Sequence, residues 1–159
     1  MMSTNWDHFL GRLGEYPEGT HRILPPCPNE RIQAVQNQFG PMPNDLLDML
    51  RHFNGAKLFI KTGPLVSVFG ITTVPSLSPL VWAPEWHIDR FTARWRSSGH
   101  SHDEWPIAMM NYGVLIVLGS QGMTKEWDTG QRSWGGKELG LNERITELLR
   151  EGELYLSES

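Results

Sequence analysis

The residues best suited to metal chemistry lie in one polar stretch, His100-Ser101-His102-Asp103-Glu104. Two histidines separated by one residue can bind the same metal ion from a strand or a loop. A stable zinc site normally needs three or four ligands, however, and no Cys or His motif elsewhere supplies the others. We therefore interpret the stretch as a solvated polar link and expect neither a metal nor a cofactor.

Nucleophilic catalysis has little support in the sequence. Cys27 is the single cysteine and stands between Pro26 and Pro28, where a loop cysteine without a neighbouring base is the simpler interpretation. The chain also lacks a Gly-x-Ser-x-Gly elbow, a phosphate-binding Gly-Lys-Ser/Thr loop and a dinucleotide-binding Gly-x-Gly-x-x-Gly motif. We expect no catalytic residue and a protein that is not an enzyme.

A tryptophan-rich region is the first candidate for contact with a partner protein. Trp82 and Trp86 are four residues apart at the start of an expected helix, beside Glu85 and Asp89. Large aromatic side chains in partly open pockets dominate interface energetics, so the two tryptophans could anchor a partner. The alternative is that the aromatic residues of this region simply bury the helix against a sheet.

Glu126 and Asp128 form the second candidate, because they flank Trp127 at the expected end of a strand. They could provide an acidic contact for a basic protein surface. The alternative is a solvated turn in which Asp128 hydrogen-bonds to its own backbone.

Length and charge narrow the class of protein. A chain of 159 residues is enough for one domain with its own core. The formal net charge of −4 argues against nucleic acid as the main partner, since phosphate binding depends on clustered Lys and Arg. No segment approaches the ~18 apolar residues of a membrane span, and the N-terminal residues do not resemble a signal peptide. We expect a cytoplasmic protein without a membrane partner.

Hydrophobic periodicity predicts helices alternating with short strands, and hence an α+β fold. We expect helices over 5–13, 28–40, 43–53 and 84–99, and a last helix capped by Asn142 and ended by Gly152. Strand-like segments are expected at 20–24, 57–61, 65–72 and in a meander over 105–128. Val114–Leu118 is apolar throughout and should be a central strand covered on both faces. The Gly-rich run 129–140 is expected to be a loop.

Two of these segments together resemble the SUKH superfamily, which includes a fungal cell-wall synthesis regulator and many bacterial immunity proteins. The first is similar to the family's helix pair ending in an Asn-Gly turn, and its matching residues are Gly40, Pro43, Asn54 and Gly55. The second is similar to the family's Pro-Ile-Ala strand and hairpin ending in Trp-Asp, and its matching residues are Pro106, Gly113, Gly122 and Trp127. With the last helix, the resemblance covers residues 28–152.

The resemblance implies a single SUKH-like domain over 1–159, with an N-terminal extension at 1–27 and an acidic tail at 153–159. It implies a mixed or mainly antiparallel sheet of about five or six strands with helices packed against it. It also implies binding without catalysis, and the expected role is an immunity protein that neutralises a toxin by stoichiometric binding. The alternative is a regulatory or scaffold module that binds a cellular protein.

Overall fold

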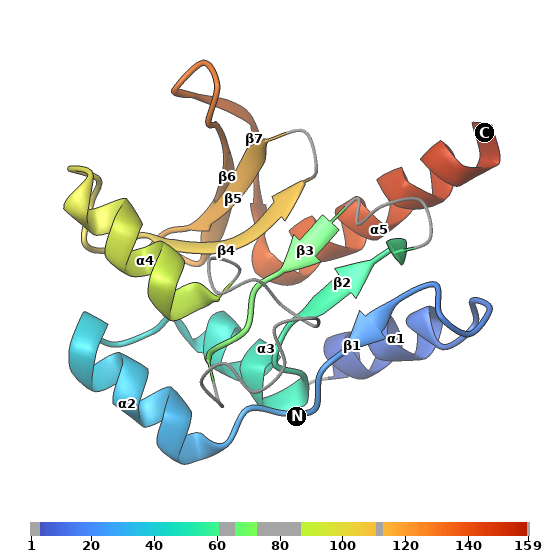
Figure 1. The fold of residues 1–159 in the computed structure, drawn as a ribbon, viewed down its shortest axis with the longest axis horizontal. Coiled ribbons are helices and arrows are strands. Elements are labelled where there is room, and N and C mark those ends of the chain that lie inside the picture. Colours follow the sequence, from blue (N-terminus) through green and yellow to red (C-terminus); the bar gives the residue numbers. More distant parts are fainter. Residues whose placement is uncertain (1–3, 61–65, 73–86, 111–112, 159) are drawn as a thin grey trace.

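The structure is a computed structural model that describes residues 4–60, 66–72, 87–110 and 113–158. Within these residues the chain forms five helices and one open seven-stranded antiparallel sheet (Figure 1). The expected α+β class is therefore confirmed, whereas the expected count of five or six strands is too low. None of the described helices is both long enough and apolar enough to cross a membrane.

The sheet is a meander in which each strand pairs with the next one along the chain. Its strands are β1 (Arg22–Ile23), β2 (Ala56–Leu58), β3 (Val66–Val68), β4 (Trp105–Met110), β5 (Val114–Leu118), β6 (Met123–Asp128) and β7 (Ser133–Gly140). The predicted meander over 105–128 is thus present as β4, β5 and β6. Leu115 to Leu118 are all buried, as expected for a central strand.

The run 129–140 was wrongly predicted as a loop, because most of it is β7. This strand pairs with β6 along its length, with Trp127 opposite Trp134 and Asp128 opposite Ser133. Pairing of this kind uses only main-chain N–H and C=O groups, so glycine and polar residues can take part in it. Since β7 is an edge strand exposed along Ser133–Glu138, it carries no apolar alternation that would mark it as a strand.

Helices pack on both faces of the sheet, with more of them on one face than on the other (Figure 1). They are α1 (Thr4–Leu13), α2 (Asn29–Phe39), α3 (Asn44–His52), α4 (Ile88–Ser97) and α5 (Leu141–Glu158). Trp95 on α4 contacts Trp127, whereas Arg144 on α5 contacts Thr124 and Glu126. Because successive side chains of a strand point to opposite faces, α4 and α5 pack on opposite faces of β6. Helices α1 and α3 contact α5 and so belong to its face.

The core confirms the predicted inner faces of several helices. Ile32 and Val35 on α2, and Leu46 and Leu50 on α3, are buried. The buried inner residues of α5 are Ile145, Leu148 and Leu149.

Residues 4–27, in the expected N-terminal extension, contribute to both the core and the sheet. The rings of Trp6 and Phe9 on α1 are buried and lie 5.5 and 5.8 Å from the ring of Phe53. β1 also adds a strand to the sheet by pairing with β2. The N-terminal segment therefore completes both the core and one sheet edge.

Two helix starts differ from the prediction. Helix α4 begins at Ile88, because His87 is extended and forms a bridge with Gly70. Residues 84–86, where the helix was expected to begin, lie outside the described residues. Helix α5 begins at Leu141, so Asn142 is its second residue and is not its N-cap.

The end of α5 also differs, because the helix continues through the expected acidic tail to Glu158. Gly152 lies inside the helix and does not end it. A Cβ atom at this position would lie 2.0 Å from Cε2 of Phe59, so glycine is needed for close packing. Glu153 is held by Arg12 of α1, whose Nη2 donates to Oε1 at 2.7 Å.

The first segment of the SUKH resemblance holds several chain segments together. The Asn54 side chain donates from Nδ2 to the Ile71 carbonyl at 2.9 Å and accepts from the Ile71 N–H at 2.7 Å. Gly55 has a φ of 94°, and a Cβ there would lie 2.8 Å from both Gly70 N and Val68 O. Only glycine tolerates both constraints. Pro43 was predicted to be the first residue of α3 but lies just before it, so the helix begins one residue later than predicted. Gly40 caps α2.

In the second segment, Pro106 lies in β4 and Trp127 in β6, while Gly113 and Gly122 precede β5 and β6 with positive φ angles. These residues therefore occupy structural positions within the meander.

Candidate functional site

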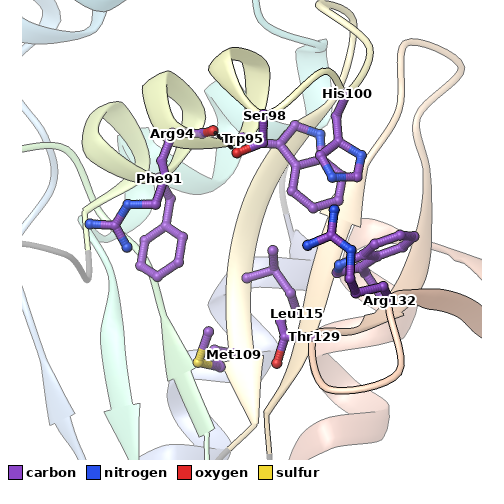
Figure 2. Close-up of a pocket in the computed structure, with 10 residues that line it drawn as sticks. Phe91, Arg94, Trp95, Ser98, His100, Met109, Leu115, Thr129 and Arg132 are labelled. Carbon is purple, nitrogen blue, oxygen red and sulfur yellow. Dashed lines mark hydrogen bonds between the residues drawn. The ribbon is translucent and has the colours of Figure 1, made fainter.

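An open pocket of about 580 Å³ lies between α4 and the sheet (Figure 2). We call it the α4 groove. Its apolar lining residues are Phe91, Trp95, Met109, Leu115 and Trp127, and its polar ones are Arg94, Ser98, His100, Thr129 and Arg132. Helix α4, the strands β4 to β6 and the turn before β7 therefore all contribute.

The floor of the groove follows from the register of the meander. Met109 lies opposite Leu115, Leu115 opposite Trp127, and Trp127 opposite Trp134. Side chains at paired positions point to the same face of a sheet, so these four residues form one row across β4 to β7. The first three side chains of the row form a continuous apolar floor for the groove, and Trp134 extends the row beyond the residues that line it.

Aromatic contacts build one wall of the groove. The rings of Trp95 and His100 stack at 3.5 Å between centroids, with an interplanar angle of 9°. Trp127 meets Trp95 edge-on at 5.6 Å and lies 4.9 Å from Trp134. Trp95 Nε1 also donates to Oε1 of Glu104 at 3.0 Å. These contacts restrain the aromatic side chains, while 40% of Trp134 stays exposed to solvent.

The rim of the groove carries positive charge. Arg94 and Arg132 are exposed, and Figure 2 shows them on opposite sides of Met109 and Leu115. Neither guanidinium forms an ion pair with a carboxylate in the part of the chain that the structure describes. Lys125 Nζ lies 4.4 Å from the ring centroid of Trp134 and adds a third cation at the end of the row.

Three of the four acidic residues predicted for partner contact accept hydrogen bonds within the chain. Asp89 accepts from the N–H and hydroxyl of Thr72, each at 3.2 Å. Glu126 accepts from Arg144 Nη1 at 2.8 Å. Asp128 accepts from the main-chain N–H groups of residues 130 and 131, each at 2.9 Å, so the alternative of a backbone-bonded turn is confirmed for it.

The structure does not gather these candidates into one acidic surface. Glu126 and Asp128 point to the face of the sheet opposite Trp127, because they alternate with it along β6. Trp82, Glu85 and Trp86 lie outside the described residues. Of the predicted partner residues and the motif residues, Trp127 alone lines the α4 groove.

Sequence reasoning missed the two arginines as parts of a site. Arg94 falls three residues after Phe91 on α4, and its guanidinium carbon lies 5.5 Å from the ring centroid of that residue. Arg132 is the last residue of the turn between β6 and β7. A usable signal was the placement of Trp127 and Trp134 on either side of the turn Thr129–Arg132, which is the pattern of a hairpin with paired aromatic residues.

Neither Cys27 nor the polar stretch His100–Glu104 has surroundings suited to catalysis or metal binding in the described structure. Burial raises the pKa of the Cys27 thiol to about 11, which keeps it protonated and unreactive. His100 and Glu104 both contact Trp95 as described above. Across residues 4–60, 66–72, 87–110 and 113–158, no group of three or more His, Cys, Asp or Glu side chains is arranged to hold a metal ion.

The fold and the groove together define an α+β domain with an open, aromatic and cation-rimmed surface groove. In comparisons with known proteins, no family model matches the chain and no curated protein shows significant similarity to it.

Proposed function

We propose that this chain is a non-catalytic, SUKH-type protein-binding domain that acts as an immunity protein by binding a bacterial toxin stoichiometrically. The observation that carries the binding function is the open α4 groove, whose lining residue Trp127 remains partly accessible and contacts the exposed Trp134 beside the groove. Tryptophan and arginine are the residue types that contribute most to protein interfaces. A groove that presents both is therefore suited to a protein partner.

The SUKH assignment is supported by the resemblance of residues 28–152. Several of its motif residues fall at element boundaries that a helix pair followed by a meander requires. Asn54 and Gly55 connect α3 to β2, and Gly113 and Gly122 precede β5 and β6. The toxin-binding role is supported by the resemblance alone. The motif residues do not identify the toxin, since partner specificity depends on surface residues outside these motifs.

The test is to look for a toxin gene directly upstream of the gene of this chain and, where one is present, to co-express the two. We expect growth to be rescued and a stoichiometric complex to elute as one species in size-exclusion chromatography. A toxin taken from an unrelated locus serves as the control and should not be neutralised. Absence of both rescue and complex would refute the immunity role for the adjacent pair.

A gene without a neighbouring toxin gene would favour the regulatory or scaffold alternative. In that case affinity purification under native conditions should recover one stoichiometric cellular protein. The two roles are thus separated by gene position and by the identity of the protein recovered.

A further inference from the structure

We propose that the α4 groove recognises an acidic segment of the partner protein, in which a large apolar side chain is flanked by carboxylates. This inference rests on the proposed binding function and specifies the chemistry of the partner. It reverses the expectation from the sequence, which was an acidic contact made to a basic surface.

The apolar half of the inference follows from the groove floor. Phe91, Met109 and Trp127 are each only half-buried, although they pack against the core. Their remaining apolar surface faces an open volume of about 580 Å³, within the range of ordinary ligand pockets of roughly 300–1,000 Å³. An aromatic or branched aliphatic side chain entering there would remove that surface from water.

The acidic half follows from charge. Arg94 and Arg132 line the groove and have no ion-pair partner in the described parts of the chain. Lys125 lies beside the groove, against the ring of Trp134. The nearby carboxylate of Glu104 is bonded to Trp95, and that of Asp128 to its own turn. Because its described lining includes these two arginines and no acidic residue, the groove is cationic on a chain whose net charge is −4. Carboxylates placed between the guanidinium groups could form charge-assisted hydrogen bonds.

The backbone of Arg132 gives independent support. Its φ of 53° is in the left-handed region, which favours glycine over residues with a Cβ atom. Its N–H donates to the Asp128 carbonyl at 2.7 Å and closes the turn. Figure 2 shows the side chain directed toward Trp95 and Leu115. A strained position that carries an arginine toward a groove is the kind of outlier from which a binding role is inferred.

Single-stranded nucleic acid is the main competing ligand, because bases stack on tryptophan and phosphates pair with arginine. The net charge of the chain opposes it, since neighbouring acidic groups repel a phosphate backbone. An acidic protein segment carries fewer negative charges than a phosphate backbone, and it also offers an apolar side chain between its carboxylates. We therefore make nucleic acid an outcome of the test.

The first experiment uses a defined probe, the blocked peptide acetyl-Glu-Asp-Glu-Phe-Leu-Glu-Asp-Glu-amide. Binding is followed through the indole N–H signals of ¹⁵N-labelled protein, which Trp127→Phe and Trp134→Phe assign. We expect both signals to shift, and the affinity to fall at least about tenfold when the acids of the peptide are replaced by Gln and Asn. Equal binding of the neutral peptide, no shift of either signal, or tighter binding of oligothymidine would overturn the inference.

The second experiment uses variants of the intact chain. Arg94→Glu with Arg132→Glu should weaken peptide binding at least about tenfold, whereas the charge-matched control Arg22→Glu with Arg51→Glu should not. Arg132→Gly removes the guanidinium, so it should weaken binding. Because it also relieves the left-handed strain, the protein should stay at least as thermally stable. If the folded groove variants bind the peptide as tightly as the wild type does, the inference is wrong.

The same variants separate this inference from the proposed function. If the wild type forms the toxin complex and Arg94→Glu/Arg132→Glu forms it equally well, the groove inference falls and the binding function stands. If no complex forms with the adjacent toxin but the acidic peptide binds at Trp127 and Trp134, the immunity role falls and the groove inference stands.

Discussion

Arg144 on α5 donates from Nη1 to Oε2 of Glu126 on β6 at 2.8 Å, and the arginine is almost fully buried. Its Nε also donates to the hydroxyl of Thr124 at 2.9 Å, and Nη2 donates to the Lys137 carbonyl. One side chain thus ties α5 to both β6 and β7. Glu126 is the counterion of this arginine and so has a structural role of its own.

Replacing Arg144 by Met should destabilise the fold by about 2–3 kcal/mol. The variant would leave the acceptors on Thr124 and Lys137 without their donor, and Glu126 without its counterion. The measurement is the free energy of unfolding in urea. Arg150→Met is the matched control, because its ion pair with Glu147 is exposed and should contribute nothing measurable. Equal losses in the two variants would contradict the role assigned to Arg144.

Asn54→Ala should lower the free energy of unfolding by about 2–3 kcal/mol. The side chain is buried, and its removal would leave both the N–H and the carbonyl of Ile71 unpaired. Asn37→Ala is the control, since Asn37 is exposed on α2 and its hydrogen bond to Gln33 faces solvent. Equilibrium unfolding of the two variants side by side tests this, and an unchanged midpoint for Asn54→Ala would refute it.

Gly152→Ala should destabilise the protein by about 1–3 kcal/mol, although alanine is the better helix former. The cause is the Cβ atom, which would lie 2.0 Å from the ring of Phe59. Gly11→Ala in α1 is the opposite case, because nothing lies within 4 Å of the added Cβ. That variant should be stabilised by up to about 1 kcal/mol. Thermal melts of both variants decide the matter, since propensity alone predicts the same sign for each.

Stability should rise with pH between about 4 and 6.5 because of His21. Burial lowers the pKa of this imidazole to about 4, and its Nδ1 accepts the N–H of Phe59 at 3.1 Å. In the unfolded chain the pKa is about 6.5, so the unfolded state binds the extra proton in this window. The contribution is complete above about pH 6.5 and is lost as the pH falls toward 4.

The test is the free energy of unfolding measured across this window. One proton can contribute a slope of at most about 1.4 kcal/mol per pH unit. The slope of His21→Gln should be smaller than that of the wild type by the part due to His21. Parallel curves for the two proteins would show that His21 does not titrate in this way.

Local pattern was sufficient where burial follows the period of an element. Helices α2 and α3 and the strands of the central meander were predicted because their apolar residues repeat at helical spacing or form a continuous run. β7 lacked any such signal, since an exposed edge strand is held by main-chain bonds to β6. The end of α5 was missed because Gly152, normally a helix-ending residue, is required there by Phe59.

The sequence by itself determined the α+β class, the meander and most of the inner faces, because these depend on residues close together in the chain. The tertiary structure alone decided the site. Two of the acids singled out from the sequence, Asp89 and Glu126, accept hydrogen bonds from Thr72 and Arg144, which lie 17 and 18 positions away. Conversely, the groove arises where α4 meets a row of side chains drawn from three strands. Contacts between residues so far apart in the sequence leave no periodic signal. The positive charge at the groove therefore became evident only in the folded chain.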